Sequence, residues 1–108
     1  MSDSTDLARF AVSLASANQP PLVMVSGEID LANVGEFEEA MAKAVSGSRE
    51  LTVDLTDVGY CDSAAVRALF ALAAATELTM IVGQTGQIKA LLGISGLDRV
   101  ATVVVKGG

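Results

Sequence analysis

The alternation of short apolar runs with longer helix-like segments constrains the fold of this chain more than any other sequence feature. Residues 51–55 (LTVDL), 78–82 (LTMIV) and 100–105 (VATVVV) are short and rich in β-branched residues, which is typical of buried strands. Between them lie residues 64–76 (AAVRALFALAAAT) and 85–93 (TGQIKALLG), whose composition and spacing predict helices. Strands that alternate with helices over short connections predict an α/β domain with a mixed, partly parallel sheet.

The first half of the chain adds two strands and one helix to this pattern. Residues 8–15 (ARFAVSLA) alternate in the period of a half-buried strand, and residues 22–27 (LVMVSG) read as a second strand, so we expect a hairpin. From Asn33 the apolar spacing changes to three and four, which predicts a helix with Asn33 and Glu36 as a capping pair. Gly93 is expected just beyond the end of the last helix. The predicted order is β-β-α-β-α-β-α-β.

Length and composition predict one domain with an aliphatic core. The chain has 108 residues, the size of one ordinary domain, and no linker or internal repeat divides it. We therefore expect residues 1–108 to form a single domain with its core at about residues 8–106. Hydrophobic residues make up 51% of the chain but aromatic residues only 4%, so Val, Leu, Ile and Ala must fill the core.

Charge and residue counts exclude several classes of function. Seven basic and thirteen acidic residues give a net charge of -6. Because the basic residues form no patch, we expect no binding to nucleic acid or to an anionic membrane surface. The chain has no histidine and one cysteine, which removes His-based catalysis, His-ligated metals and thiolate zinc clusters. We expect a protein that is not an enzyme and holds no metal or cofactor. The absence of a leader-like start and of a long apolar run predicts a cytoplasmic protein.

The candidate functional residues lie where predicted strands pass to helices, above all at Asp62 and Ser63. One of the two is expected to cap the following helix, with a side-chain oxygen that accepts a backbone N–H. A serine at this place is surrounded by free backbone donors and the positive end of the helix dipole, so the fold tolerates a phosphate there. Phosphorylation would add about -1.5 to -2 charges beside Asp62 at pH 7.

Two other groups allow a chemical and a structural interpretation. Glu28 and Asp30 form a carboxylate pair that could perform acid-base chemistry or could simply be solvated loop residues. Cys61 could be a reactive thiol near a helix start or a small buried residue that fills the core. The glycines of residues 83–87 (GQTGQ) lack the lysine and spacing of a phosphate-binding loop and predict a turn.

Three stretches of the chain together resemble a known family. They are residues 25–41 (VSGEIDLANVGEFEEAM), 51–69 (LTVDLTDVGYCDSAAVRAL) and 78–100 (LTMIVGQTGQIKALLGISGLDRV). In this order they are similar to the signature blocks of STAS domains, specifically the bacterial anti-sigma factor antagonists. The resemblance covers about residues 10–105, and the Asp-Ser pair that opens a helix is its most specific part.

This resemblance implies a partner-switching role in transcription regulation and the bacterial stress response. The serine that matches Ser63 is phosphorylated in the family by an anti-sigma factor that is also a serine kinase. The unphosphorylated antagonist binds this partner and frees the sigma factor; phosphorylation stops binding, and a PP2C-type phosphatase restores it. The resemblance implies a partner-binding surface made of Asp30, Asp62, Ser63, Ala64, Ala65 and Arg67.

Ala64 and Ala65 depart from the family pattern, which commonly has Ser or Thr and then Gly at these positions. They change the surface offered to a partner. Two alternatives stand beside the leading hypothesis. One is a STAS subunit of an ABC-type lipid transport complex that uses the same face without a phosphorylation cycle. The other is a redox sensor that acts through Cys61.

Overall fold

The computed structural model describes residues 8–84 and 86–106 and shows a five-stranded sheet with three α-helices. The elements follow in the order β1 (Arg9–Ser13), β2 (Leu22–Ile29), α1 (Val34–Val45), β3 (Glu50–Cys61), α2 (Ser63–Ala75), β4 (Glu77–Gly83), α3 (Gln87–Ser95), the 3-10 helix η2 (Leu97–Arg99) and β5 (Thr102–Lys106). This order confirms the predicted β-β-α-β-α-β-α-β arrangement.

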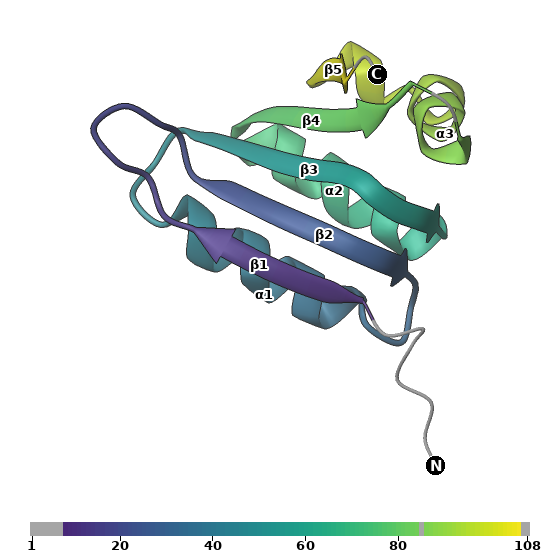
Figure 1. Ribbon diagram of the computed structural model, residues 1–108, viewed down its shortest axis with the longest axis horizontal. Coiled ribbons are helices and arrows are strands. Elements are labelled where there is room, and N and C mark those ends of the chain that lie inside the picture. The colour runs from purple at the N-terminus through teal and green to yellow at the C-terminus, as the bar shows by residue number, and fades with distance from the viewer. Residues whose placement is uncertain (1–7, 85, 107–108) are drawn as a thin grey trace.

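The strands lie side by side in chain order, from β1 at one edge of the sheet to β5 at the other (Figure 1). β1 and β2 pair antiparallel, which confirms the hairpin, and each later strand pairs parallel with the one before it. The mixed, partly parallel sheet is therefore the predicted one. Because β2 and β3 are parallel neighbours, the loops that follow them meet at one end of the sheet.

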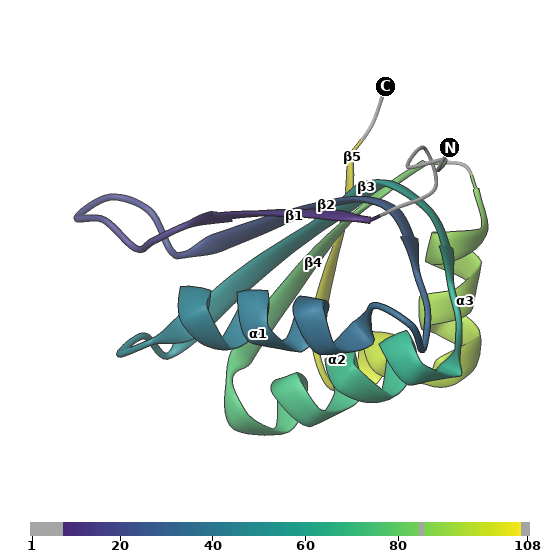
Figure 2. The ribbon, with the colours of Figure 1, turned by 90° about the horizontal axis from the view of Figure 1, so that it is seen from below.

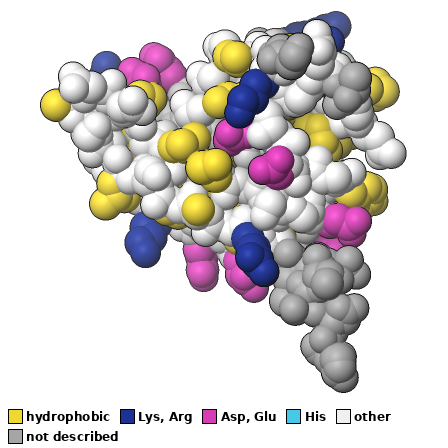
Figure 3. All heavy atoms as spheres, in the orientation of Figure 1, with side chains coloured by type: hydrophobic (Ala, Val, Ile, Leu, Met, Phe, Trp, Pro, Cys, Tyr) yellow, Lys and Arg dark blue, Asp and Glu magenta, His cyan; other side chains and the backbone are white. Residues whose placement is uncertain are grey.

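The helices cover one face of the sheet and leave the other face open (Figure 2). Side chains that point toward the helices alternate along β3 and β4, where Val53 and Met80 are fully buried. Phe37 of α1 is the one aromatic side chain buried in the described part of the chain, which agrees with the predicted aliphatic core. Each buried aliphatic side chain contributes about 1.5–3 kcal/mol, so the helix-covered face stabilises the fold. On the open face, hydrophobic and charged side chains are intermixed (Figure 3).

Strand β3 is longer than predicted. Residues 56–63 were expected to form an irregular loop after Leu55, but the strand continues to Cys61 and pairs with a β2 that itself extends to Ile29. Two register shifts interrupt the ladder between β2 and β3 and place extra residues on β3. Such irregularities disturb the alternation of buried and exposed side chains, so the second half of β3 lacks the pattern by which a strand is recognised.

The end of α3 also differs from the prediction. Gly93 lies inside the helix, which continues to Ser95. The residue that ends it is Gly96, which has a left-handed φ of 88° and donates its N–H to the Gly93 carbonyl at 3.3 Å. The left-handed conformation at a helix end favours glycine. Gly93 and Gly96 both fit this requirement in the sequence, so the pattern alone did not distinguish them. The predicted start of this helix at Thr85 lies outside the described residues.

Candidate functional site

The junction between β3 and α2 is built around the carboxylate of Asp62. This residue is the N-cap of α2, and its Oδ1 accepts the N–H groups of Ala64 at 2.9 Å and Ala65 at 3.2 Å. A cap of this kind stabilises a helix by about 0.5–2 kcal/mol. Asp62 rather than Ser63 therefore fills the capping role that the sequence left open between them. Ser63 is the first residue of the helix, and its side chain is exposed.

Asp62 also joins two loops that are far apart in the sequence. Its second oxygen, Oδ2, accepts the N–H of Leu31 at 2.9 Å, and its own N–H donates to the carbonyl of Ile29 at 3.1 Å. Both loops lie at the same end of the sheet, where β2 and β3 pass to α1 and α2 (Figure 1). The β2–α1 loop is therefore held directly beside Ser63.

The β2–α1 loop is folded by its own side chains. Asp30 Oδ1 accepts the N–H groups of Ala32 at 3.0 Å and Asn33 at 3.3 Å. The Asn33 side chain accepts the Asp30 N–H at 3.0 Å and donates to the Glu28 carbonyl at 2.9 Å. The predicted capping pair is wrong, because Asn33 makes no side-chain hydrogen bond to α1. Its amide closes the loop instead.

The acid-base interpretation of Glu28 and Asp30 gains no support from this geometry. Asp30 is half-buried, and its carboxylate binds backbone N–H groups of its own loop. Glu28 is exposed and lies opposite Tyr60 in the ladder between β2 and β3. Asp30 thus shapes the loop beside Ser63.

Two exposed apolar residues at this end of the sheet were missed by the sequence analysis. Leu31, at the tip of the β2–α1 loop, is 76% exposed, and Tyr60, near the end of β3, is 45% exposed. Leu31 is the residue whose N–H binds Asp62, and Tyr60 lies two residues before Asp62 in the chain. The signal for Leu31 was present in the sequence, because a large apolar residue stands in a polar loop between a strand and a helix.

The remaining predicted contact residues lie along the first turns of α2. Arg67 is exposed four residues after Ser63, so the two side chains share one face of the helix. Ala64 is half-buried, whereas Ala65 is fully buried under the helix. No described residue other than glycine has a positive φ, so Ala65 occupies the place of the family glycine without backbone strain. Its side chain does not reach the surface.

Cys61 packs as a core residue at the end of β3. It is 7% exposed, and burial raises the pKa of its thiol to about 12, with a further contribution from the Asp62 carboxylate. The thiol rather than the reactive thiolate is therefore favoured at neutral pH. This geometry supports the structural interpretation of Cys61 and weakens the redox alternative.

Within residues 8–84 and 86–106, no group of three or more His, Cys, Asp or Glu side chains is placed to hold a metal ion. In the same ranges, no helix is long and apolar enough to span a bilayer.

Comparison with known proteins places the chain in a family and among structures of one fold. The family model described as "Mlab, STAS domain" matches residues 12–106. No curated protein sequence matches the chain. The crystal structure of an anti-sigma factor antagonist from Mycobacterium paratuberculosis is similar, with a TM-score of 0.79 and 23% identity over 93% of this chain and 87% of that one.

Two further solved structures share the fold at lower identity. One is an uncharacterized protein of the DUF3478 family with a SpoIIAA-like fold from Shewanella loihica PV-4, with a TM-score of 0.61 and 10% identity over 98% of this chain and 90% of that one. The other is the anti-sigma factor antagonist SpoIIAA in its unphosphorylated form, with a TM-score of 0.53 and 14% identity over 85% of this chain and 97% of that one. The chain belongs to the STAS-domain family and has the fold of the anti-sigma factor antagonists.

Proposed function

We propose that this STAS domain is an anti-sigma factor antagonist that is switched by phosphorylation of Ser63. The unphosphorylated chain binds an anti-sigma factor with serine kinase activity, which then releases its sigma factor. Phosphorylation ends this binding, and a PP2C-type phosphatase restores it. The protein acts in the cytoplasm as a kinase substrate and not as an enzyme. The observation that carries the proposal is the exposed Ser63 side chain, which opens α2 beside a loop held in place by Asp62.

A phosphate on Ser63 would disturb the contacts of Asp62. Both Asp62 oxygens are occupied, one by the first turn of α2 and one by Leu31. A phosphate of about -1.5 to -2 charges would compete for the same N–H groups and would repel the carboxylate beside it. A hundredfold loss of partner affinity corresponds to about 2.7 kcal/mol, which this change in charge can supply at a desolvated interface.

The proposed partner surface combines the polar residues with the exposed apolar ones. Ser63, Arg67 and Ala64 offer the face of α2, and Leu31 and Tyr60 add apolar area next to it. Tyr and Arg are among the residue types that most often dominate the binding energy of an interface, and an exposed leucine adds apolar area that a partner can bury. Asp62 and Asp30 support this surface through their loop contacts. Ala65 is fully buried and is therefore not part of the surface.

The direct test is to incubate the chain with its cognate kinase and ATP and to map the phosphorylated residue by mass spectrometry. Because the chain has no histidine to activate Ser63, the base must come from the kinase. We expect labelling at Ser63, loss of labelling in Ser63→Ala, and retained partner binding by that variant. Thr56 is the matched control, since its hydroxyl donates to Asp54 Oδ1 at 2.6 Å. Labelling at Thr56 instead would overturn the assignment.

A second candidate function is a subunit of an ABC-type lipid transport complex, which assembles through the same face without phosphorylation. The apolar character of the exposed Leu31 and Tyr60 and of the half-buried Ala64 favours it, because permanent interfaces are more apolar than transient ones. Co-purification with an ABC ATPase, and equal binding by Ser63→Ala and Ser63→Asp, would support this candidate against the phosphorylation switch.

A further inference from the structure

The outer edge of β5 is an edge of the sheet that no other described strand covers. Within residues 8–84 and 86–106, no strand pairs with this side of β5. Its central residues are three valines without charge or proline, its ladder with β4 has no register shift, and Val104 is 44% exposed. Proteins usually protect such edges with charges, prolines or bulges because the free N–H and C=O groups pair readily with another strand.

A hollow lies next to β5 on the helix-covered side of the sheet. Its volume is about 470 Å³, and Ala90, Leu92 and Gly93 of α3 and Val103 of β5 form the apolar part of its lining. The charged residues Lys89 and Asp98 also line it. It exists because α3 packs under β3 and β4, so the underside of the edge strand is not filled by a helix of its own. Val105, which lies on the same side of β5 as Val103, is 38% exposed.

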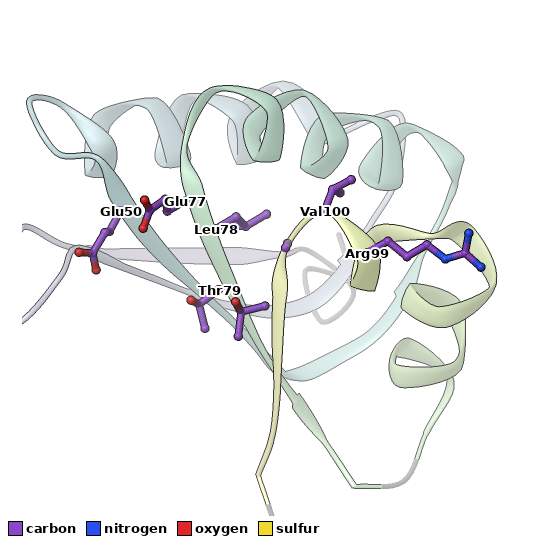
Figure 4. Close-up of a pocket in the computed structure, with 8 residues that line it drawn as sticks. Glu50, Glu77, Leu78, Thr79, Arg99 and Val100 are labelled. Atoms are coloured by element: carbon purple, nitrogen blue, oxygen red, sulfur yellow. The ribbon is translucent and has the colours of Figure 1, made fainter.

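A second hollow, of about 410 Å³, lies where β3, β4 and β5 begin (Figure 4). Glu50 and Glu77 line it and are opposite each other in the ladder between β3 and β4. Like charges at directly opposed positions destabilise a sheet. The nearby Arg99 extends away from both glutamates (Figure 4), and Thr102 of β5 forms part of the same wall.

We propose that the outer edge of β5 pairs antiparallel with β5 of a second copy of this chain, about a two-fold axis at Val104. In this register Val104 lies opposite Val104 of the second copy. Val103 lies opposite Val105 of the second copy, and Thr102 lies opposite Lys106 of the second copy. Opposed residues in an antiparallel pair point to the same face of the sheet, so each side chain has a defined neighbour.

A second copy fits this edge because the same strand fills both hollows. Val105 of the second copy points to the helix side beside Val103 and covers the apolar hollow. Lys106 of the second copy arrives beside Thr102, where its long side chain extends toward Glu77 on the neighbouring strand β4. The pairing therefore brings an apolar group to the apolar part of the first hollow and a cation toward the Glu77 carboxylate, and symmetry repeats both contacts.

The pairing gives a weak dimer that leaves the Ser63 surface free. A five-residue strand buries less area than a standard stable interface, so we expect a dissociation constant in the micromolar range. Ser63 follows the end of β3, two strands away from the paired edge. The dimer would thus present two Ser63 surfaces, and its existence does not depend on the proposed function.

Sedimentation equilibrium over a concentration series of the full chain tests the proposal. We expect the average mass to rise from 11.0 kDa at low concentration toward twice that value near about 1 mM. Val104→Lys and Val104→Glu should each weaken dimerisation at least tenfold, because like charges would face each other across the axis. An equimolar mixture of the two variants should restore the dimer, because Lys then lies opposite Glu.

Two controls keep the outcome decisive. Leu14→Lys changes an apolar side chain that is 63% exposed but lies away from β5, so this variant should dimerise like the wild type. If Val104→Lys loses the circular dichroism spectrum of the native fold, Val104→Cys replaces it and should form a symmetric disulfide, which Leu14→Cys should not. A wild type of 11.0 kDa at every concentration, normal dimerisation of folded Val104→Lys, or no restoration in the mixture would overturn the proposal.

Discussion

Asp30 and Asp62 occupy equivalent places at the ends of neighbouring strands but have different structural roles. Asp30 follows Ile29 and Asp62 follows Cys61, and these two buried residues are partners in the ladder between β2 and β3. Asp30 folds its own loop, residues 30–33, with one oxygen that accepts two nearby N–H groups. Asp62 divides its oxygens between the cap of α2 and the N–H of Leu31. One carboxylate builds a loop, and the other joins two loops into one surface.

The largest expected effect that separates these roles comes from Asp62→Ala. This variant loses the cap of α2, which contributes about 0.5–2 kcal/mol, and the bond to Leu31, which contributes about 1 kcal/mol more. We expect the free energy of unfolding to fall by about 1.5–3 kcal/mol in urea titrations. Asp62→Ser is the matched variant, since its hydroxyl can cap the helix but is too short to hold Leu31. A loss below about 0.5 kcal/mol for Asp62→Ala would contradict the double role.

Cys61, the buried neighbour of Asp62, predicts that the fold loses stability at high pH. Its thiol has an ordinary pKa of 9.0, which burial and the Asp62 carboxylate raise to about 12 in the folded chain. Above pH 9 the unfolded state releases a proton that the folded state keeps. The free energy of unfolding should therefore fall as the pH rises from 9 to 12, by up to about 1.4 kcal/mol per pH unit.

Urea titrations at pH 8 and pH 10 measure this dependence, with Cys61→Ala as the control that lacks the thiol. Alanine removes the titrating group but keeps a small apolar side chain. A pH dependence that is the same in Cys61→Ala and in the wild type would show that other groups cause it. Ile29, the partner of Cys61 in the ladder, has no group that titrates. It therefore adds no pH dependence to the junction between β2 and α1.

Asp30→Ala should have a smaller and more local effect. It removes two hydrogen bonds to the backbone of the β2–α1 loop. The start of α1 is unaffected, because the Asp30 side chain makes no hydrogen bond to the helix. We expect a loss of about 1 kcal/mol in the free energy of unfolding. Glu38→Ala, at an exposed position of α1, is the control and should stay within about 0.5 kcal/mol of the wild type. Equal losses for Asp30→Ala and Asp62→Ala would erase the distinction between the two junctions.

The smallest expected effect is that of Ser63→Asp on folding. A carboxylate at the first position of α2 gains from the helix dipole and loses from its neighbour Asp62, so the two contributions nearly cancel. The free energy of unfolding should stay within about 0.5 kcal/mol of the wild-type value in the same urea titration. A weaker affinity of this variant for a partner would then reflect the altered surface. A loss of more than about 1 kcal/mol would instead attribute weaker binding to unfolding.

The sequence predicted the element order and the importance of the β3–α2 junction because both rest on local patterns. Strand runs, helix spacing and the Asp-Ser pair each lie within a few residues. The bond between Asp62 and Leu31 joins residues 31 positions apart, so no local pattern contains it. The last six residues of β3 were missed because register shifts disrupt their alternation, and Asn33 was misassigned because its amide closes a loop in place of capping a helix.

Amide hydrogen exchange at Leu31 tests the central claim, that the Asp62 carboxylate holds the two loops together beside Ser63. The comparison is between the wild type, Asp62→Ser and Glu38→Ala, measured well below the unfolding transition. We predict faster exchange of the Leu31 N–H in Asp62→Ser, by about fivefold or more for a lost bond of about 1 kcal/mol, and unchanged exchange in Glu38→Ala. The same exchange rate at Leu31 in Asp62→Ser and in the wild type would contradict the account.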